Sequence, residues 1–300
     1  MASNSPQSPA PADPRPAAPA PEFEQPAIDP PGHEHELTPR ADHGEDSYRG
    51  LGRLTDRVAL ITGGDSGIGR AVALAFAREG ADVALAYLPE EESDASETCR
   101  WIEQAGRTAL PLSGDITDER QCQAHVESVH RRFGRLDVLV NNAAFQRNRE
   151  GLDDIDSEEF DRTFRTNVYA TFWLCRSALR VMTEGGVILN TTSIQGYEPS
   201  PTLLPYAATK SAIISMTKSL AKLVADRGIR VNAVAPGPVW TPLIPSTLPE
   251  EHVRKFGDNT TFGRPAQPVE LAPLYVFLAS NEARFVTGEV YGATGGRTPY

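Results

Sequence analysis

The sequence predicts an α/β protein: one domain built on a doubly wound sheet of about seven parallel strands, with helices on both faces. Two observations lead to this prediction. From Val58 onward, short apolar runs alternate with longer segments in which apolar residues recur at helical spacing. Glycine and polar clusters directly follow most of the apolar runs, and no internal linker interrupts the alternation. Strands that alternate with helices in this way form parallel sheets covered on both sides.

The first expected strand, Val58 to Thr62, is followed by a glycine-rich turn and by a helix that ends near Gly80. Ligands of such sheets bind beyond the carboxyl ends of the strands, so the polar clusters at those ends mark the candidate site. Further strands are expected at 83–87, 108–112, 136–140, 186–192, 229–234 and 288–292, and further helices at 90–105, 118–133, 157–182, 205–227 and 268–280.

Composition and charge exclude several classes of function. The 300 residues are 40% hydrophobic and 23% charged, as in a soluble globular protein, and the net charge is −11. Neither nucleic acid nor an anionic membrane surface is therefore an expected partner. No apolar run approaches the roughly 20 residues of a membrane helix. The cysteines, Cys99, Cys122 and Cys175, have no metal-ligand spacing and cannot all pair, so we expect no metal site and a reducing, cytoplasmic location.

The first fifty residues differ from the rest. Eleven of the 25 prolines fall in the first 40 positions, and residues 1–50 hold 9 acidic and 3 basic residues but few large apolar ones. We expect a disordered, proline-rich acidic tail over 1–50 and a catalytic domain over 51–300, so that deleting residues 1–45 leaves a folded core. His33, His35 and His43 are either metal ligands or, more simply, polar groups of a solvated tail.

The glycine-rich turn after the first strand is a candidate phosphate site. Glycine lets the backbone turn tightly and approach a pyrophosphate, and the following helix N-terminus offers free N–H groups to the anion. A purely structural turn is the alternative, since glycine serves many tight turns. The flanking strand and helix favour dinucleotide binding by Gly63, Asp65, Ser66, Gly67, Ile68 and Gly69.

Tyr206 and Lys210 form a candidate acid–base pair. They are four residues apart and share one face of the expected helix at 205–227. A nearby ammonium lowers the pKa of a phenol, which is otherwise near 10. Such a pair also occurs by chance, but Ser193 ends the strand at 186–192 at the same sheet edge and offers a hydroxyl for a substrate oxygen. Ser193 has neither the glycine elbow nor the triad partners of a hydrolase.

With these residues in place, the chain resembles the short-chain dehydrogenase/reductase family from about residue 55 to its end. The family's Thr-Gly-(x)3-Gly-Ile-Gly matches Thr62 to Gly69, its Tyr-x-x-x-Lys matches Tyr206 to Lys210, and its serine matches Ser193. Its structural asparagine matches Asn167. The motif Asn-Asn-Ala-Gly appears as Asn141 to Ala144, with alanine in the last position, and Pro-Gly appears as Pro236-Gly237.

The resemblance implies a Rossmann fold and an NAD(P)-dependent oxidoreductase, similar to bacterial general-stress and glucose/ribitol-dehydrogenase-like proteins and to a broad aldehyde reductase. It implies that Ser193 and Tyr206 bind the substrate oxygen, that Lys210 acts on Tyr206, and that Asn167 supports a proton relay. It also implies a homodimer or homotetramer formed through the helices at 157–182 and 205–227. Further cofactor contacts are expected at Tyr87, Asp115, Ile116, Asn142, Ala143, Ala144, Pro236, Gly237, Val239 and Thr241.

The substrate side is less defined. A small aldehyde, ketone or polyol is expected, and residues 240–263 have the character of a lid whose apolar residues serve either the substrate or the core of the lid itself. The expected activity is hydride transfer between a carbonyl compound and its alcohol. The alternatives are a sugar or polyol dehydrogenase and a dinucleotide-binding sensor without turnover. Substrate-lining positions are expected at Phe145, Gln146, Gln195, Tyr197 and Trp240.

The residues expected near the adenosine ribose modestly favour NAD over NADP. The second strand ends near Tyr87, where NAD-specific relatives carry an aspartate, and no Lys or Arg lies between Arg78 and Arg100. Asp65 and the run from Glu90 to Glu92 would repel a 2′-phosphate. Against this, Arg70 and Ser66 are potential phosphate ligands, so dual use stays open.

Overall fold

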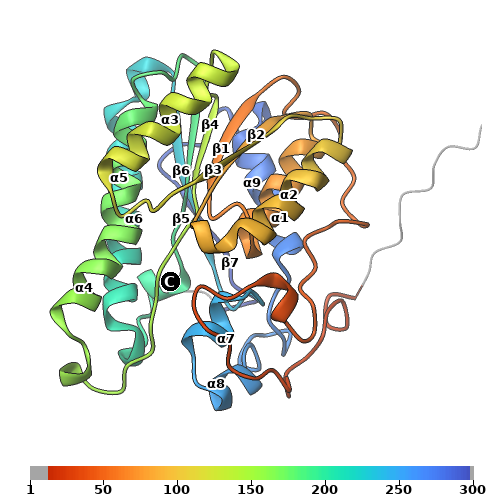
Figure 1. Ribbon diagram of the computed structural model, residues 1–300, viewed down its shortest axis with the longest axis vertical. Coiled ribbons are helices and arrows are strands. Elements are labelled where there is room, and N and C mark those ends of the chain that lie inside the picture. The colour runs from red at the N-terminus through yellow and green to blue at the C-terminus, as the bar shows by residue number, and fades with distance from the viewer. Residues whose placement is uncertain (1–12, 298–300) are drawn as a thin grey trace, which may run out of the picture.

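The computed structural model describes residues 13–297 and has seven parallel strands in the order β3-β2-β1-β4-β5-β6-β7 (Figure 1). The apolar runs of the five inner strands form the centre of the sheet because these strands are buried on both faces, whereas the edge strands β3 and β7 are partly exposed. The strands are β1 (Val58–Thr62), β2 (Asp82–Tyr87), β3 (Ala109–Ser113), β4 (Val138–Asn141), β5 (Val187–Thr191), β6 (Arg230–Pro236) and β7 (Val290–Ala293). The predicted doubly wound α/β sheet is confirmed.

The helices cover both faces of this sheet, with α1, α2 and α9 on one side and α3, α5 and α6 on the other (Figure 1). Their bounds are α1 (Gly67–Arg78), α2 (Glu92–Gln104), α3 (Glu119–Phe133), α4 (Ser157–Phe164), α5 (Ala170–Ala178), α6 (Leu204–Leu223), α7 (Leu243–Thr247), α8 (Glu250–Arg254) and α9 (Pro268–Ala279). Among the described residues, none of these helices has both the length and the apolar character needed to cross a membrane.

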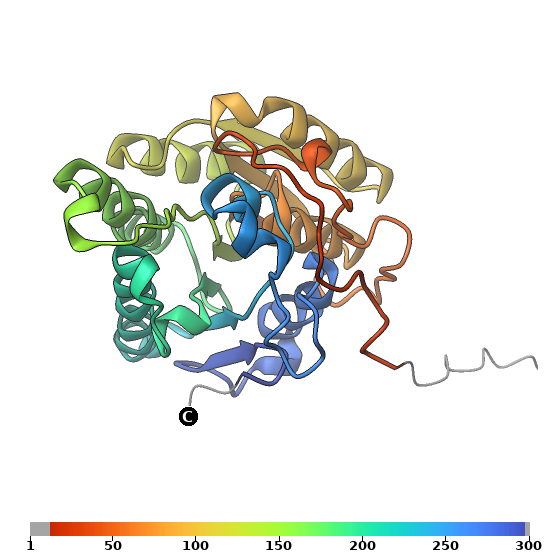
Figure 2. The same cartoon turned by 90° about the horizontal axis from the view of Figure 1, so that it is seen from below.

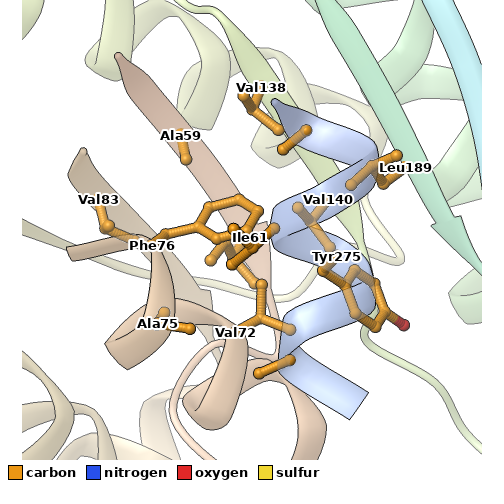
Figure 3. Packing of buried hydrophobic residues seen from close by; sticks show 14 of the residues in the cluster. Ala59, Ile61, Val72, Ala75, Phe76, Val83, Val138, Val140, Leu189 and Tyr275 are labelled. Atoms are coloured by element: carbon orange, nitrogen blue, oxygen red, sulfur yellow. The ribbon is translucent and has the colours of Figure 1, made fainter. Parts of the chain in front are cut away.

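Alternate residues of each strand enter opposite cores, as the period of two requires. Ala59 and Ile61 of β1 face α1 and α9, where Phe76 and Tyr275 are fully buried (Figure 3). Leu60, between them, faces α3 and α5 instead. The three cysteines are unpaired thiols, and Cys122 and Cys175 are buried.

The helix expected over 157–182 is interrupted. It begins at Ser157, where the Asp156 carboxylate caps it by accepting a hydrogen bond from the Glu159 N–H (2.7 Å). One π-helical turn then spans Arg165–Tyr169 before α5 continues. The turn makes room for Asn167, whose side chain points into the protein and is 1% exposed. Such π turns recur at functional sites.

The expectation of a disordered tail over 1–50 is wrong for residues 13–50, while residues 1–12 lie outside the described part of the chain. This segment runs along α7 and α8 and then toward α1 and α2 (Figure 2). Its apolar residues are few, but Phe23 stacks on Trp240 with ring centroids 4.3 Å apart, and Leu37 is 2% exposed. Polar contacts add to this small core, as when the Arg254 guanidinium donates to the Glu22 carboxylate (2.5 Å).

Candidate active site

A cavity of about 900 Å³ opens beyond the carboxyl ends of the strands. Segments after β1, β2, β3, β4, β5 and β6 all contribute to it, which is the expected place for a ligand of a doubly wound sheet. Most of the site residues expected from the sequence line it: Gly63, Ser66, Gly67, Ile68, Tyr87, Asp115, Ile116, Asn142, Ala143, Ala144, Phe145, Gln146, Ser193, Gln195, Tyr206, Lys210, Pro236, Gly237, Val239 and Thr241.

Five expected residues do not line the cavity: Asp65, Gly69, Asn167, Tyr197 and Trp240. The prediction that Trp240 contacts substrate is therefore wrong. Its side chain is fully buried in the lid, against Phe23, and its indole Nε1 donates a hydrogen bond to the carbonyl oxygen of Pro39 (2.7 Å). Tyr197 likewise lies away from the cavity wall, at the end of the short turn Ile194–Gly196.

Within the glycine turn, Gly67 and Gly69 are too tightly packed to carry side chains. A Cβ on Gly69 would lie 1.7 Å from the carbonyl oxygen of Gly63, and one on Gly67 would lie 2.9 Å from Cγ2 of Thr241. The Asn142 amide donates to the same Gly63 oxygen (3.1 Å), which ties the turn to the end of β4. A backbone cradle thus opens onto the cavity at the start of α1, and it fits the pyrophosphate of a dinucleotide.

The candidate acid–base pair lies where α6 begins. Pro205, in the first turn of the helix, needs no N–H partner there and places Tyr206 and Lys210 on its buried face. The Lys210 Nζ lies 5.2 Å from the centroid of the Tyr206 ring and donates to the carbonyl oxygen of Thr191 (2.9 Å), at the end of β5. Ser193, two residues further on, completes the group and is 7% exposed.

Burial dominates the electrostatics of this pair. It raises the pKa of Tyr206 to about 12, against the lowering effect of a hydrogen bond with Ser193, and it lowers the pKa of Lys210 to about 7. The expectation that the lysine ammonium lowers the tyrosine pKa is therefore not met, because the site disfavours both charged forms. Tyr206 is held as a neutral phenol, which is a proton donor.

Asn167 lies outside the cavity wall and connects two of the segments that form the site. Its Oδ1 accepts from the Phe145 N–H (2.8 Å), and its Nδ2 donates to the Phe145 carbonyl (2.9 Å) and to Oγ1 of Thr209 (3.0 Å). The side chain therefore joins the loop after β4 to the helix that carries Tyr206. Sequence reasoning found this residue but not its partners, which depend on the π-helical turn.

The wall beside β2 is acidic. Glu90 and Glu91 line the cavity, while Asp65 is fully buried beneath the glycine turn. Burial raises the pKa of Asp65 to about 7 and that of Glu91 to about 8, and the charge of Asp65 contributes to the second shift. The Tyr87 hydroxyl donates to the Glu92 carboxylate (2.9 Å). This end of the cavity disfavours additional negative charge.

Arg70, a potential phosphate ligand by sequence, is held in place away from the cavity. Its guanidinium is 3% exposed and donates to the Asp65 carbonyl (2.8 Å), to the Asp94 carbonyl (3.1 Å) and to the Glu97 carboxylate (3.2 Å). These three bonds occupy the side chain without any contact to the cavity wall.

Several lining residues were missed or left undecided by the sequence. Pro30 and Pro31 come from the N-terminal segment, and no local pattern indicated that this segment reaches the cavity. Of the apolar lid residues, Leu243, Ile244, Leu248 and Phe256 line the cavity, whereas Phe262 does not and is 43% exposed. Ile244 also packs in the core of the lid, so both alternatives hold for it.

Comparisons with known proteins agree with this geometry. A family model described as enoyl-(acyl carrier protein) reductase matches residues 63–298. The uncharacterised oxidoreductase YhxD of Bacillus subtilis is 52% identical over 272 residues, which cover 89% of this chain and 91% of that relative. The glucose and ribitol dehydrogenase of Daucus carota is 45% identical over 271 residues, covering 89% of this chain and 93% of that one.

A solved structure gives the same result. The short chain dehydrogenase of Burkholderia cenocepacia, in complex with NADP, superimposes with a TM-score of 0.76 and 34% identity. The match covers 81% of this chain and 98% of that one. Family model, relatives, fold and site geometry converge, and the chain belongs to the short-chain dehydrogenase/reductase family as an NAD(P)-dependent oxidoreductase.

Proposed function

We propose that the protein interconverts a small aldehyde or ketone and its alcohol, with Tyr206 as the acid–base group. The observation that carries the proposal is the convergence of Ser193, Tyr206 and Lys210 on one cavity that also holds the glycine turn. The nicotinamide ring, when bound, supplies or accepts the hydride. The cavity has room for a small substrate between this group and lid residues such as Leu243 and Thr247.

In the proposed mechanism, Ser193 and Tyr206 hydrogen-bond the substrate oxygen and orient it. Tyr206 donates its phenolic proton to that oxygen in reduction and removes the alcohol proton in oxidation. Lys210, fixed by the Thr191 carbonyl, lies close enough to the Tyr206 ring to stabilise a phenolate when one forms. Asn167 holds α6 and the loop after β4 in fixed positions relative to each other, through its hydrogen bonds with Thr209 and Phe145.

The raised pKa of Tyr206 favours the reductive direction at neutral pH. A neutral phenol is ready to protonate the developing alkoxide, whereas oxidation first requires a phenolate that burial disfavours. Polyol or sugar oxidation is the second candidate, and the similarity to the carrot glucose and ribitol dehydrogenase supports it. A binding sensor is the third, and the complete acid–base group argues against it.

The cofactor preference we propose is dual use with a lean to NAD. Glu90 and Glu91 line the cavity after β2, where the adenosine ribose of a dinucleotide is expected, and the raised pKa of Glu91 indicates that this part of the wall disfavours a further negative charge such as a 2′-phosphate. Arg70, the side chain best placed in sequence to compensate, is engaged with Asp65, Asp94 and Glu97. The ratio of kcat/KM for NADH and NADPH tests this proposal, and a preference for NADPH above about tenfold, 1.4 kcal/mol, contradicts it.

The deciding experiment is a two-direction screen with both cofactors, using aldehydes and ketones in one direction and alcohols, polyols and sugars in the other. Tyr206→Phe removes only the phenolic oxygen and is expected to lower kcat about 10²–10⁴-fold while cofactor binding survives. Tyr169→Phe is the matched control, because Tyr169 is 40% exposed and lies outside the cavity wall. A Tyr206→Phe variant with more than half the parent rate would refute the acid–base role.

The proposal also includes a reducing, cytoplasmic location. Its support is the three free thiols, two of which are buried. Burial raises the pKa of Cys122 and of Cys175 to about 12, so both are poorly reactive toward disulfides.

A further inference from the structure

The N-terminal segment at residues 21–45, here called the strap, connects two parts of the cofactor site. It holds the lid, through the stack of Phe23 on Trp240 and the hydrogen bond from Trp240 to Pro39. Gly32, with φ at +81°, approaches the lid so closely that a Cβ there would lie 3.1 Å from the Pro242 carbonyl oxygen. The strap therefore packs against the lid over much of its length (Figure 2).

Between these two lid contacts, the strap reaches the glycine turn through Glu34. This side chain is 2% exposed, and its Oε1 accepts a hydrogen bond from the Gly67 N–H (2.5 Å). The Glu34 backbone N–H donates to the Asp94 carboxylate (3.0 Å), which fixes the strap to α2 as well. Gly67 lines the cavity and Glu34 does not, so Glu34 holds the turn without itself lining the cavity.

The charge of Glu34 is balanced inside the protein. Nε2 of His43 lies 2.9 Å from its Oε1, and His43 contacts Glu45 through the other ring nitrogen (3.0 Å). Burial alone would lower the pKa of His43, but the charge of Glu34 and hydrogen bonds to both glutamates raise it to about 9. Burial alone would raise the pKa of Glu34, but His43 and Arg70 lower it. Both groups are therefore charged at neutral pH.

The strap also forms part of the cavity wall, where Pro30 and Pro31 join Ser66 and Gly67. A dinucleotide in the cavity would therefore contact the strap directly, and it would contact a turn whose position the strap fixes. Gly67 is the first residue of α1, and its φ is +49°, a conformation that glycine adopts readily and other residues rarely do. The hydrogen bond from its N–H to Glu34 helps to hold the backbone in this conformation.

We propose that Glu34 is a positioning residue for the dinucleotide: through the Gly67 N–H it holds the glycine turn in its binding conformation, and it makes the strap a part of the cofactor site. The role does not depend on which substrate is used or on Tyr206 as acid. It concerns binding of the whole dinucleotide, so NAD(H) and NADP(H) are affected alike.

Equilibrium binding to the full chain tests the proposal. Glu34→Ala is expected to raise the Kd for NADH and for NADPH at least about tenfold, since a hydrogen bond to a charged group is lost at a buried site. At saturating cofactor, kcat is expected to stay within twofold of the parent value. Glu34→Gln keeps an oxygen acceptor for the Gly67 N–H and is expected to recover most of the affinity. Glu24→Gln, at an exposed position in the same strap, is the matched control and is expected to leave Kd unchanged.

Two results would overturn the proposal. The first is a folded Glu34→Ala variant whose Kd for NADH is within twofold of the parent value. The second is a Glu34→Gln variant that binds as weakly as Glu34→Ala, because the Gly67 hydrogen bond would then not be the cause.

Hydrogen exchange of the unmodified protein covers the case in which the variants do not fold. Added NAD⁺ is expected to slow amide exchange both in the glycine turn and in residues 28–45, because the strap and the turn are ordered together. Protection of the glycine turn without protection of the strap would contradict the proposed coupling.

Discussion

Truncation of Phe23 measures how firmly the strap is attached. The ring is 6% exposed and stacks on Trp240 at an interplanar angle of 27°, so Phe23→Ala removes nearly a full aromatic burial. Burial of a phenylalanine contributes about 1.5–3 kcal/mol and an aromatic pair about 0.5–1.5 kcal/mol more, which gives an expected loss of about 2–4.5 kcal/mol. The loss cannot exceed the free energy that docks the strap, if the strap opens separately from the domain.

Two measurements follow the change. If strap and domain unfold together, the midpoint of thermal unfolding is expected to fall by about 4–9 °C, at about 2 °C per kcal/mol for a chain of this size. If the strap opens alone, protease is expected to cut it while the domain keeps its midpoint. In either case Trp240, fully buried in the parent, becomes exposed and its emission shifts to longer wavelength.

Leu51→Ala is the matched control, because Leu51 is 80% exposed and its truncation removes little buried surface. The reasoning is refuted if Phe23→Ala matches this control in unfolding midpoint, in protease sensitivity and in tryptophan emission. Deletion of residues 1–45, expected from the sequence to be harmless, is now expected to expose Trp240 in the same way.

Three further predictions concern the site and the assembly. The kcat for alcohol oxidation is expected to rise about tenfold per pH unit between pH 7 and 10, because oxidation needs the Tyr206 phenolate and burial holds the pKa of Tyr206 near 12. Reduction uses the neutral phenol and is expected to lack this rise, so pH profiles of kcat measured in both directions check the prediction. Gly69→Ala is expected to cost about 3 kcal/mol in urea unfolding or to prevent folding, because the Gly63 carbonyl blocks its Cβ, while Gly292→Ala, with 3.5 Å to its nearest neighbour, is tolerated. Light scattering at micromolar concentration is expected to show a dimer or tetramer, with half-exposed Phe172 of α5 at a contact, and a monomer would contradict this.

The fold was predictable because its signals are local. Each strand is a short apolar run and each helix has its own apolar stripe, so the alternation alone specified the seven parallel strands. The break at Arg165–Tyr169 was not predictable, since a π-helical turn leaves the apolar spacing almost unchanged. The candidate acid–base residues and the glycine turn, which the structure brings to one cavity, could be singled out because their spacing lies within single elements and their loops.

The errors share a different cause, because they concern contacts between distant parts of the chain. Trp240 follows a strand end, as substrate-lining residues do, but its partner Phe23 lies more than two hundred residues earlier. The composition of the first fifty residues argued for disorder. Composition does not show that two of the few apolar side chains, Phe23 and Leu37, are buried against distant parts of the chain. The pKa of Tyr206 was misjudged for a similar reason, since the sequence shows the nearby lysine but not the depth of burial.

The strap also constrains the order in which the protein matures during synthesis. The strap is made well before its partners in the lid, since Trp240 comes 201 residues after Pro39, whereas its partners Gly67 and Asp94 follow it closely. The strands and helices in between can assemble as they emerge. The contacts between the strap and the lid must wait until Trp240 has been made, and a nascent chain that stalls before Trp240 would hold the strap on the glycine turn without the lid beside it.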